Sequence, residues 1–146
     1  ELFRPELIVT SAYLRASETA RIIAGALGLP LEVEPQLLER EIGSHRGRSY
    51  DSFLAEADYD PQHPWAWKPH GGESYEDVRA RVAPILDRLA ALHPDRDVVV
   101  VSHGGVMTAL WAHVAGSWDE AYAPPNCGMV LIEHGPHGYA KPQVVD

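Results

Sequence analysis

Asp97-Val98-Val99-Val100-Val101-Ser102-His103-Gly104-Gly105 is the stretch of the sequence that decides the fold. Its four consecutive valines are typical of a strand buried on both faces inside a parallel sheet. The apolar residues that follow, 106–115, predict a helix, and Gly116 stands where the C-cap of that helix belongs. His103 is therefore expected where a buried strand turns into a helix, which is the edge of an open α/β sheet where ligands bind.

The pair of glycines after His103 favours a functional role for this turn. The start of a helix offers free backbone N–H groups and a partial positive charge, and both suit a phosphate. Gly104 and Gly105 leave the backbone bare at that point, and a turn with only a structural role rarely needs both. The alternative is a helix-capping or core histidine, and the glycines make anion binding the better interpretation.

The residues on either side of this stretch alternate between strand and helix patterns. Residues 7–11 predict a short strand, and residues 15–27 predict a helix that Gly28 and Pro30 end. Residues 129–132 predict a final strand. This alternation favours one α/β domain over residues 1–146, a three-layer α/β/α arrangement around a mostly parallel sheet.

The longest helix is expected to begin after Ser74. Ser74 is a plausible N-cap, and Asp77 three residues later completes a variant of the capping box. Pro84 lies inside this helix and predicts a kink or a local break. The segment before the helix, residues 44–69, contains Trp65 and Trp67 together with several prolines, and it predicts an ordered loop or lid.

Composition excludes several classes of protein. The 146 residues correspond to about one domain, and 45% of them are hydrophobic, which is enough for a real core. Twelve Lys and Arg against 21 Asp and Glu give a net charge of −9, which argues against nucleic acid as a partner. Cys127 is the only cysteine, which excludes an internal disulfide and fits a reducing compartment.

Location and metal content are also predicted. No apolar run approaches the ~20 residues that span a bilayer, and no signal segment begins the sequence. These features predict a cytoplasmic protein without a membrane partner. His134 and His137 have no nearby cysteine or carboxylate cluster, so a solvated loop is favoured there over a metal site.

Four segments together resemble the histidine phosphatase superfamily, which includes the cofactor-dependent phosphoglycerate mutases. They are residues 11–20 (SAYLRASETA), 38–43 (LEREIG), 71–74 (GGES) and 102–105 (SHGG). Asn126 also falls where that family often has an asparagine. The resemblance runs from about Pro5 to Ile132 in the family's order and spacing, and it implies a phosphoglycerate mutase-like fold.

The resemblance implies a role for several positions. His103 would stabilise charge on the phosphoryl oxygens, Glu39 would give a proton to the leaving oxygen, and Arg15 would bind the transferring phosphoryl group. These roles suit phosphoryl transfer, which depends on positioning and on stabilising negative charge. Taken alone, Arg15 and Glu39 would be interpreted as solvated side chains. The candidate substrate-binding groups are Ser11, the backbone N–H of Gly104, and Asn126.

One part of the family pattern does not match. The family's phospho-accepting histidine lies in an Arg-His-Gly motif at the end of an N-terminal strand, and the sequence does not contain that motif. His45-Arg46-Gly47 has a similar composition, but no buried strand precedes it, so His45 is not the expected nucleophile. The chain could be a fragment of a longer enzyme, borrow the strand from a partner chain, or be a pseudo-enzyme.

We expect a fragment of an active enzyme that lacks the N-terminal strand and helix. Omission of a central strand leaves buried backbone groups unpaired, at ~1–3 kcal/mol each. Against a total stability of ~5–15 kcal/mol, such a chain should not persist alone as a well-packed monomer.

The predicted function is that of a phosphomonoesterase. It would act on a small phosphorylated metabolite through a phosphohistidine intermediate, without a metal or other cofactor. The segment between Gly43 and Gly71 is short, whereas the mutases usually carry a longer insertion there. The alternatives are mutase-type phosphoryl transfer and a non-catalytic phosphate-ligand binder, and a homo-oligomer is left open.

Overall fold

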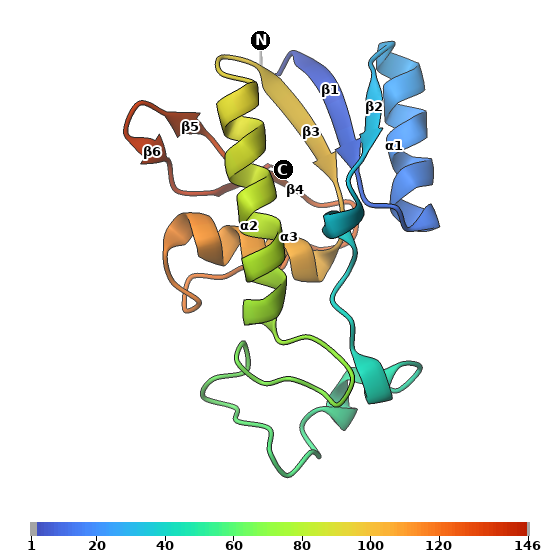
Figure 1. Ribbon diagram of the computed structural model, residues 1–146, viewed down its shortest axis with the longest axis vertical. Helices are drawn as coiled ribbons and strands as arrows, with labels where there is room; N and C mark the ends of the chain where they lie inside the picture. Colours follow the sequence, from blue (N-terminus) through green and yellow to red (C-terminus); the bar gives the residue numbers. More distant parts are fainter. Residues whose placement is uncertain (1–2, 146) are drawn as a thin grey trace.

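The computed structural model describes residues 3–145, and its central feature is a three-stranded parallel sheet in the order β2-β1-β3 (Figure 1). The middle strand is β1 (Pro5–Thr10), which pairs with β2 (Leu31–Val33) and with β3 (Asp97–Val101). Helix α1 (Leu14–Leu27) connects β1 to β2. The predicted parallel α/β arrangement is confirmed.

Helices cover both faces of this sheet and make three layers (Figure 1). On one face, Leu7 and Val9 of β1 belong to a core shared with α2 (Tyr75–Leu92) and α3 (Gly104–Ala115). Ile8 points to the other face and packs with Ala20 of α1. Successive strand residues point to opposite faces, so one apolar strand joins both layers, and each buried large side chain stabilises the fold by ~1.5–3 kcal/mol.

The predicted helix ends are found where the sequence indicates them. Gly28 and Gly116 end α1 and α3 in the left-handed conformation, with φ of 68° and 72°, which glycine adopts without steric strain. Ser74 and Asp77 form a complete capping box at the start of α2. The predicted break at Pro84 is wrong, because α2 continues through it; the proline is exposed, so its ring does not disturb the packed face of the helix.

Strand β3 differs from the prediction in its burial. Residues 98–101 are half-buried and not buried on both faces. The reason is the place of β3 in the sheet: within the part of the chain that the structure describes, β3 pairs with β1 alone. Its second edge therefore has no strand beside it among residues 3–145.

The C-terminal part is antiparallel, which the sequence pattern did not predict. The expected strand at residues 129–132 is found as β4 (Met129–Leu131), but it is not the last one, since it pairs with β7 (Gln143–Val145). Between them, β5 (His134–Gly135) and β6 (Gly138–Tyr139) form a small hairpin. His134 and His137 are exposed there, as expected for a solvated segment.

Residues 43–72, which we call the lobe, extend below the carboxyl ends of β1 and β3 (Figure 1). The chain enters the lobe after a short 3-10 helix, η1 (Pro35–Leu37), and the lobe contains two more, η2 (Gly43–His45) and η3 (Tyr50–Ser52). Its centre is aromatic: the rings of Phe53 and Trp67 lie 5.3 Å apart, and both contact His45. The segment expected as an ordered loop or lid thus consists of turns and short 3-10 helices around an aromatic centre.

Candidate active site

Two polar side chains meet where β1 and β3 end. The backbone N–H of Ser11 donates to the Val101 carbonyl at 3.1 Å and continues the pairing of the two strands. Just beyond, Nε2 of His103 lies 2.7 Å from Oγ of Ser11, and both residues are buried. Ser11 Oγ also accepts the N–H of Tyr13 at 3.2 Å. The Ser11 hydroxyl, itself held by the N–H of Tyr13, therefore fixes the orientation of the His103 ring.

Glu39 reaches the same point from the loop that follows η1. One carboxylate oxygen accepts the backbone N–H of Arg40 at 2.8 Å, and the other accepts the N–H of Gly105 at 3.2 Å. That second donor belongs to the first turn of α3, where the N–H groups have no partner within the helix. The glycine-rich helix start thus already binds a carboxyl group of the protein itself, that of Glu39.

The glycine at position 105 is explained by this carboxylate. A Cβ on Gly105 would lie 2.4 Å from Oε1 of Glu39, closer than any stable contact. A Cβ on Gly104 would meet no atom within 4 Å, and Gly104 is exposed. Of the two glycines, Gly105 makes room for Glu39, and the N–H of Gly104 remains the candidate group for a ligand.

Burial and the neighbouring charges together set the pKa of His103. Burial is the largest cause and lowers the pKa of the imidazole below its ordinary value of 6.5. The carboxylate of Glu39 raises this pKa, and the positive charges of Arg15 and Arg81 lower it. The net lowering leaves His103 neutral at neutral pH. A bound phosphate dianion would favour the protonated form, since a nearby opposite charge stabilises an ion.

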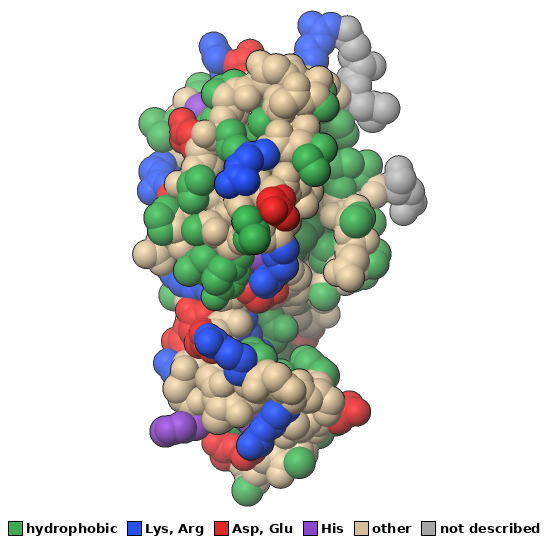
Figure 2. Space-filling model, turned by 90° about the vertical axis from the view of Figure 1, so that its right-hand side faces the viewer, with side chains coloured by type: hydrophobic (Ala, Val, Ile, Leu, Met, Phe, Trp, Pro, Cys, Tyr) green, Lys and Arg blue, Asp and Glu red, His purple; other side chains and the backbone are tan. Residues whose placement is uncertain are grey.

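Arg15 lies on the first turn of α1 at the rim of this site. Its guanidinium carbon is 5.0 Å from the centre of the Tyr13 ring, and that ring meets the His103 ring edge-on at 5.4 Å. Arg15 is exposed, so its donors are accessible to a ligand. Figure 2 shows acidic and basic side chains gathered at the waist between the sheet and the lobe.

Two other residues considered in the sequence analysis lie apart from this group. Asn126 is exposed in the turn before β4, and within residues 3–145 it forms no hydrogen bond to the other candidate residues. His45 is buried inside the lobe, where Nδ1 lies 2.7 Å from Oγ of Ser52 and Nε2 lies 3.0 Å from a carboxylate oxygen of Glu56. Since both nitrogens have partners, His45 is poorly suited to attack phosphorus.

The pattern of residues did not reveal three side chains that support Glu39. They are Arg40, Glu73 and Arg81, which bind one another or the backbone around Glu39. A charged residue in a polar loop or on an amphipathic helix is normally solvated, so composition and spacing gave no sign of them. Segments 38–43 and 71–74 contain Arg40 and Glu73, and they were the only available signals; no signal marked Arg81.

The part of the chain that the structure describes shows two further negative features. Among these residues, no three His, Cys, Asp or Glu side chains gather as metal ligands would. None of the helices in residues 3–145 combines the length and the apolar character that crossing a membrane requires.

Comparison with known proteins agrees with this geometry. The family model of the histidine phosphatase superfamily (branch 1) matches residues 2–145. Glucosyl-3-phosphoglycerate phosphatase of Mycobacterium tuberculosis is 37% identical over 121 residues, which is 75% of this chain and 54% of that protein. Adenosylcobalamin/alpha-ribazole phosphatase of Escherichia coli is 30% identical over 121 residues, 80% of this chain and 59% of that protein.

A solved structure is similar as well. The complex of mycobacterial glucosyl-3-phosphoglycerate phosphatase with inorganic phosphate superposes with a TM-score of 0.81 at 30% identity, covering 98% of this chain and 76% of that one. The chain belongs to the histidine phosphatase superfamily. It spans about half the length of the curated relatives that it matches.

Proposed function

We propose that this chain provides the proton donor and the phosphate-stabilising groups of a phosphomonoesterase that works through a phosphohistidine intermediate. The observation that carries the proposal is the meeting of His103 and Glu39 at the start of α3, with the imidazole held by Ser11. Arg15 lies close enough to influence the charge on His103. A cation, an imidazole, a carboxyl group and helix N–H groups are suited to a transferring phosphoryl group.

In the first step, a histidine nucleophile attacks phosphorus while the bond from phosphorus to the ester oxygen breaks. Protonated Glu39 gives its proton to the leaving oxygen, so the product leaves as an alcohol. Arg15, His103 and the N–H of Gly104 stabilise the charge on the other phosphoryl oxygens. In the second step, Glu39 takes a proton from water, the resulting hydroxide attacks phosphorus, and inorganic phosphate and free histidine are formed.

The nucleophile in this proposal is a histidine outside the present sequence, in an Arg-His-Gly segment that pairs with the second edge of β3. Two observations support this position. Among the described residues that edge has no partner strand, and residues 98–101 are only half-buried. A strand parallel to β3 there would deliver its carboxyl end beside His103, where the phosphoryl group is expected.

The proposed substrates are small phosphate monoesters. Glucosyl-3-phosphoglycerate, phosphoserine and alpha-ribazole phosphate compounds are the substrates that the relatives' names imply, and each is a small phosphorylated molecule. The aromatic lobe lies below the site and is the proposed source of selectivity among them.

Hydrolysis of an aryl phosphate tests this proposal. The assay uses the 146-residue chain, with its mass verified, and the chain extended by an Arg-His-Gly strand from a relative. We expect the extended protein to release phosphate and to form an acid-labile phosphoprotein during turnover. Arg15→Ala and His103→Ala should each nearly abolish this activity while leaving the fold in place.

Each result separates the competing functions. Wild-type turnover in either variant would contradict the assignment of the site. Phosphate binding without turnover by the extended protein would identify a binder, and transfer of the phosphoryl group to a second alcohol would identify a mutase. Activity of the 146-residue chain alone would contradict the position of the nucleophile.

A further inference from the structure

Arg81 of α2 is bound to the backbone that carries Glu39. Its Nη2 atom donates to the carbonyl of Leu38 at 2.8 Å and to that of Glu39 at 3.4 Å, and Nη1 donates to the carbonyl of Gln36. The side chain is only 18% exposed. One guanidinium therefore holds three carbonyls of a segment that contains no regular α-helix or strand.

Glu73 fixes the other side of the same guanidinium. Its two carboxylate oxygens accept from Nε and Nη2 of Arg81 at 2.7 and 3.0 Å, a two-point contact that defines the direction of the arginine. One of these oxygens also accepts the N–H of Glu41 at 2.9 Å. Burial alone would raise the pKa of Glu73, but the bonds from Arg81 and Glu41 outweigh it and lower the pKa.

The backbone on either side of Glu39 is therefore held by hydrogen bonds to other side chains. Leu38 and Glu39 are held through their carbonyls by Arg81, and Glu41 is held through its N–H by Glu73. Among residues 3–145, the carboxyl group itself accepts hydrogen bonds only from backbone donors, those of Arg40 and Gly105. The direction in which it points therefore depends on where this segment lies.

We propose that the Arg81–Glu73 pair is a positioning device that sets the carboxyl group of Glu39 against the start of α3. Neither residue touches the substrate; both act through the backbone of residues 36–41. The role of the pair in turnover rests on the proposed function, in which Glu39 is the proton donor. Its effect on the contact between Glu39 and Gly105 does not depend on that function.

The kinetic test compares a basic leaving group with a weakly basic one. A displaced proton donor should slow phenyl phosphate, whose leaving oxygen needs the proton, far more than p-nitrophenyl phosphate. In the chain extended by the Arg-His-Gly strand, we expect Arg81→Met to lose about 10²-fold in kcat/KM on phenyl phosphate, the loss typical of a small misplacement, but only about tenfold on p-nitrophenyl phosphate. The comparison uses kcat/KM because hydrolysis of the phosphohistidine, which also needs Glu39, is common to both substrates and affects kcat alone. Arg81→Lys should be only partly active, because an ammonium cannot make the forked contact.

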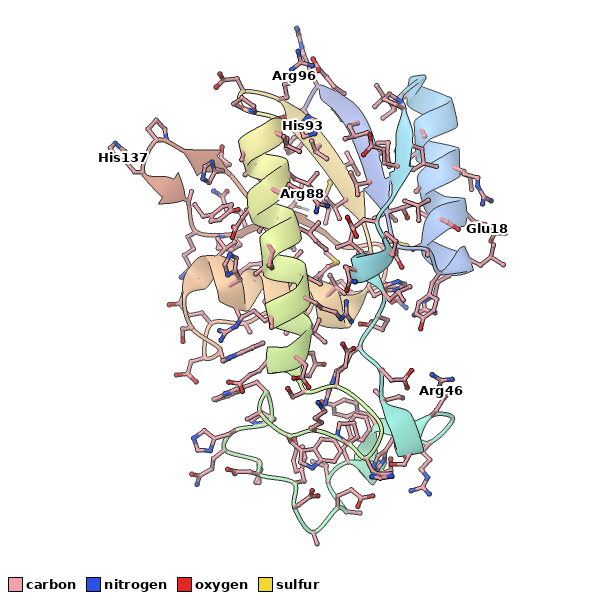
Figure 3. The ribbon with its side chains drawn as sticks, in the orientation of Figure 1. Glu18, Arg46, Arg88, His93, Arg96 and His137 are labelled. Carbon is pink, nitrogen blue, oxygen red and sulfur yellow. The ribbon has the colours of Figure 1, made fainter. Side chains whose placement is uncertain are left out.

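Arg88→Met is the matched control. Arg88 also lies on α2 and pairs with a glutamate, Glu34, but it binds none of the carbonyls that Arg81 holds. Figure 3 places Arg88 on the upper half of α2, the half farther from the lobe. This variant should show the same ratio of rates on phenyl phosphate and p-nitrophenyl phosphate as the protein without the substitution.

A second kinetic result separates positioning from general damage to the fold. In a Glu39→Gln background the proton donor is already absent, so Arg81→Met should add no further loss that is selective for phenyl phosphate. Equal losses on both substrates for Arg81→Met, or a full additional selective loss in the Glu39→Gln background, would overturn the proposal.

The Gly105 amide gives a readout that needs no enzyme activity. Its NMR signal should respond to the ionisation of Glu39 in the parent chain and in Arg88→Met, and this response should be lost in Arg81→Met and weakened in Glu73→Gln. An unchanged response in folded Arg81→Met would overturn the positioning role. If no protein hydrolyses phosphate but the Gly105 response is lost as expected, the proposed function fails and the positioning of Glu39 stands.

Discussion

At the scale of single residues, the chemistry of His103 is set by what surrounds the ring. The imidazole is buried, one nitrogen is held by Ser11, and Glu39 and Arg15 act on its charge in opposite directions. A histidine in such a place changes its protonation when an anion arrives. We therefore expect a neutral ring without ligand and a protonated ring when phosphate is bound.

The titration of His103 should show this dependence. Its pKa is lowered below 6.5, so the unfolded chain binds more protons than the folded one in the pH range just below 6.5. The free energy of unfolding should therefore fall as the pH is lowered through that range. NMR titration of the ring proton should give a pKa below 6.5 without ligand and a higher one with inorganic phosphate.

His103→Asn is the control for the stability measurement. Chemical unfolding at a series of pH values should show that the free energy of unfolding falls less below pH 6.5 in this variant than in the unsubstituted chain. A free-protein pKa at or above the ordinary value would contradict the balance of burial and charge described for this ring.

The two glycines of α3 predict opposite results for the same substitution. Gly105→Ala places a methyl group 2.4 Å from Oε1 of Glu39 and must displace that carboxylate. Overpacking in a core destabilises by about 1–3 kcal/mol, and we expect a cost near the lower end of that range here, because Oε1 is the end of a flexible side chain that can move away. Gly104→Ala enters open space and should leave stability unchanged or slightly raised, because alanine favours helix. Thermal unfolding of both variants checks this, and equal losses would show that Glu39 does not occupy the space beside Gly105.

At the scale of elements, the start of α2 links a local sequence signal to the site. Ser74 accepts the N–H of Asp77, and the Asp77 carboxylate accepts the N–H of Ser74. This reciprocal cap fixes where the helix begins, at Tyr75, two residues after Glu73 and six residues before Arg81. The cap therefore fixes the positions of Glu73 and Arg81 relative to the start of α2, and this pair holds the backbone of residues 36–41.

Removal of the cap should have a measurable cost. Ser74→Ala leaves a helix N–H without its partner and should lower the free energy of unfolding by about 1 kcal/mol. Ser117→Ala is a milder comparison, since that hydroxyl accepts the N–H of Asp119 in an exposed turn. Urea unfolding of both variants gives the two values, and a loss no larger for Ser74 than for Ser117 would contradict the role of the cap.

At the scale of the whole molecule, the lobe has its own small aromatic centre, apart from the core of the sheet. Trp67 is buried, its ring contacts His45 and Phe53, and its indole N–H donates to Asp58 at 3.1 Å. Its carbonyl accepts from Arg40, which joins the lobe to the segment that carries Glu39. Since neither core cluster of the sheet contains a residue of the lobe, we expect the lobe to open as a unit while the sheet stays folded.

Trp67→Ala tests this independence. Loss of a buried tryptophan costs about 3–5 kcal/mol, and we expect it to appear as faster amide hydrogen exchange across residues 43–72, with β1 and β3 unaffected. Leu54→Ala, at an exposed position in the same lobe, should change exchange little, since surface substitutions stay within about ±0.5 kcal/mol. Faster exchange throughout the chain in Trp67→Ala would show that lobe and sheet unfold together.

The sequence by itself predicted the features that depend on neighbours along the chain. The valine run predicted β3, Gly28 and Gly116 predicted the ends of α1 and α3, and Ser74 predicted the start of α2. These signals are readable because a cap or a strand pattern acts over a few residues. The turn after the valine run also marked His103 as a candidate, and the resemblance added Arg15 and Glu39; the roles of all three remain proposals.

Only the tertiary structure decided what depends on residues far apart in the chain. It joined His103 to Ser11 across 92 positions and set Glu39 against Gly105 across 66. It also showed that β3 is half-buried at the edge of the described sheet, and that Arg81 is turned inward to hold backbone carbonyls. Periodicity reveals which face of an element is apolar, but a polar side chain finds its distant partner only when the chain has folded.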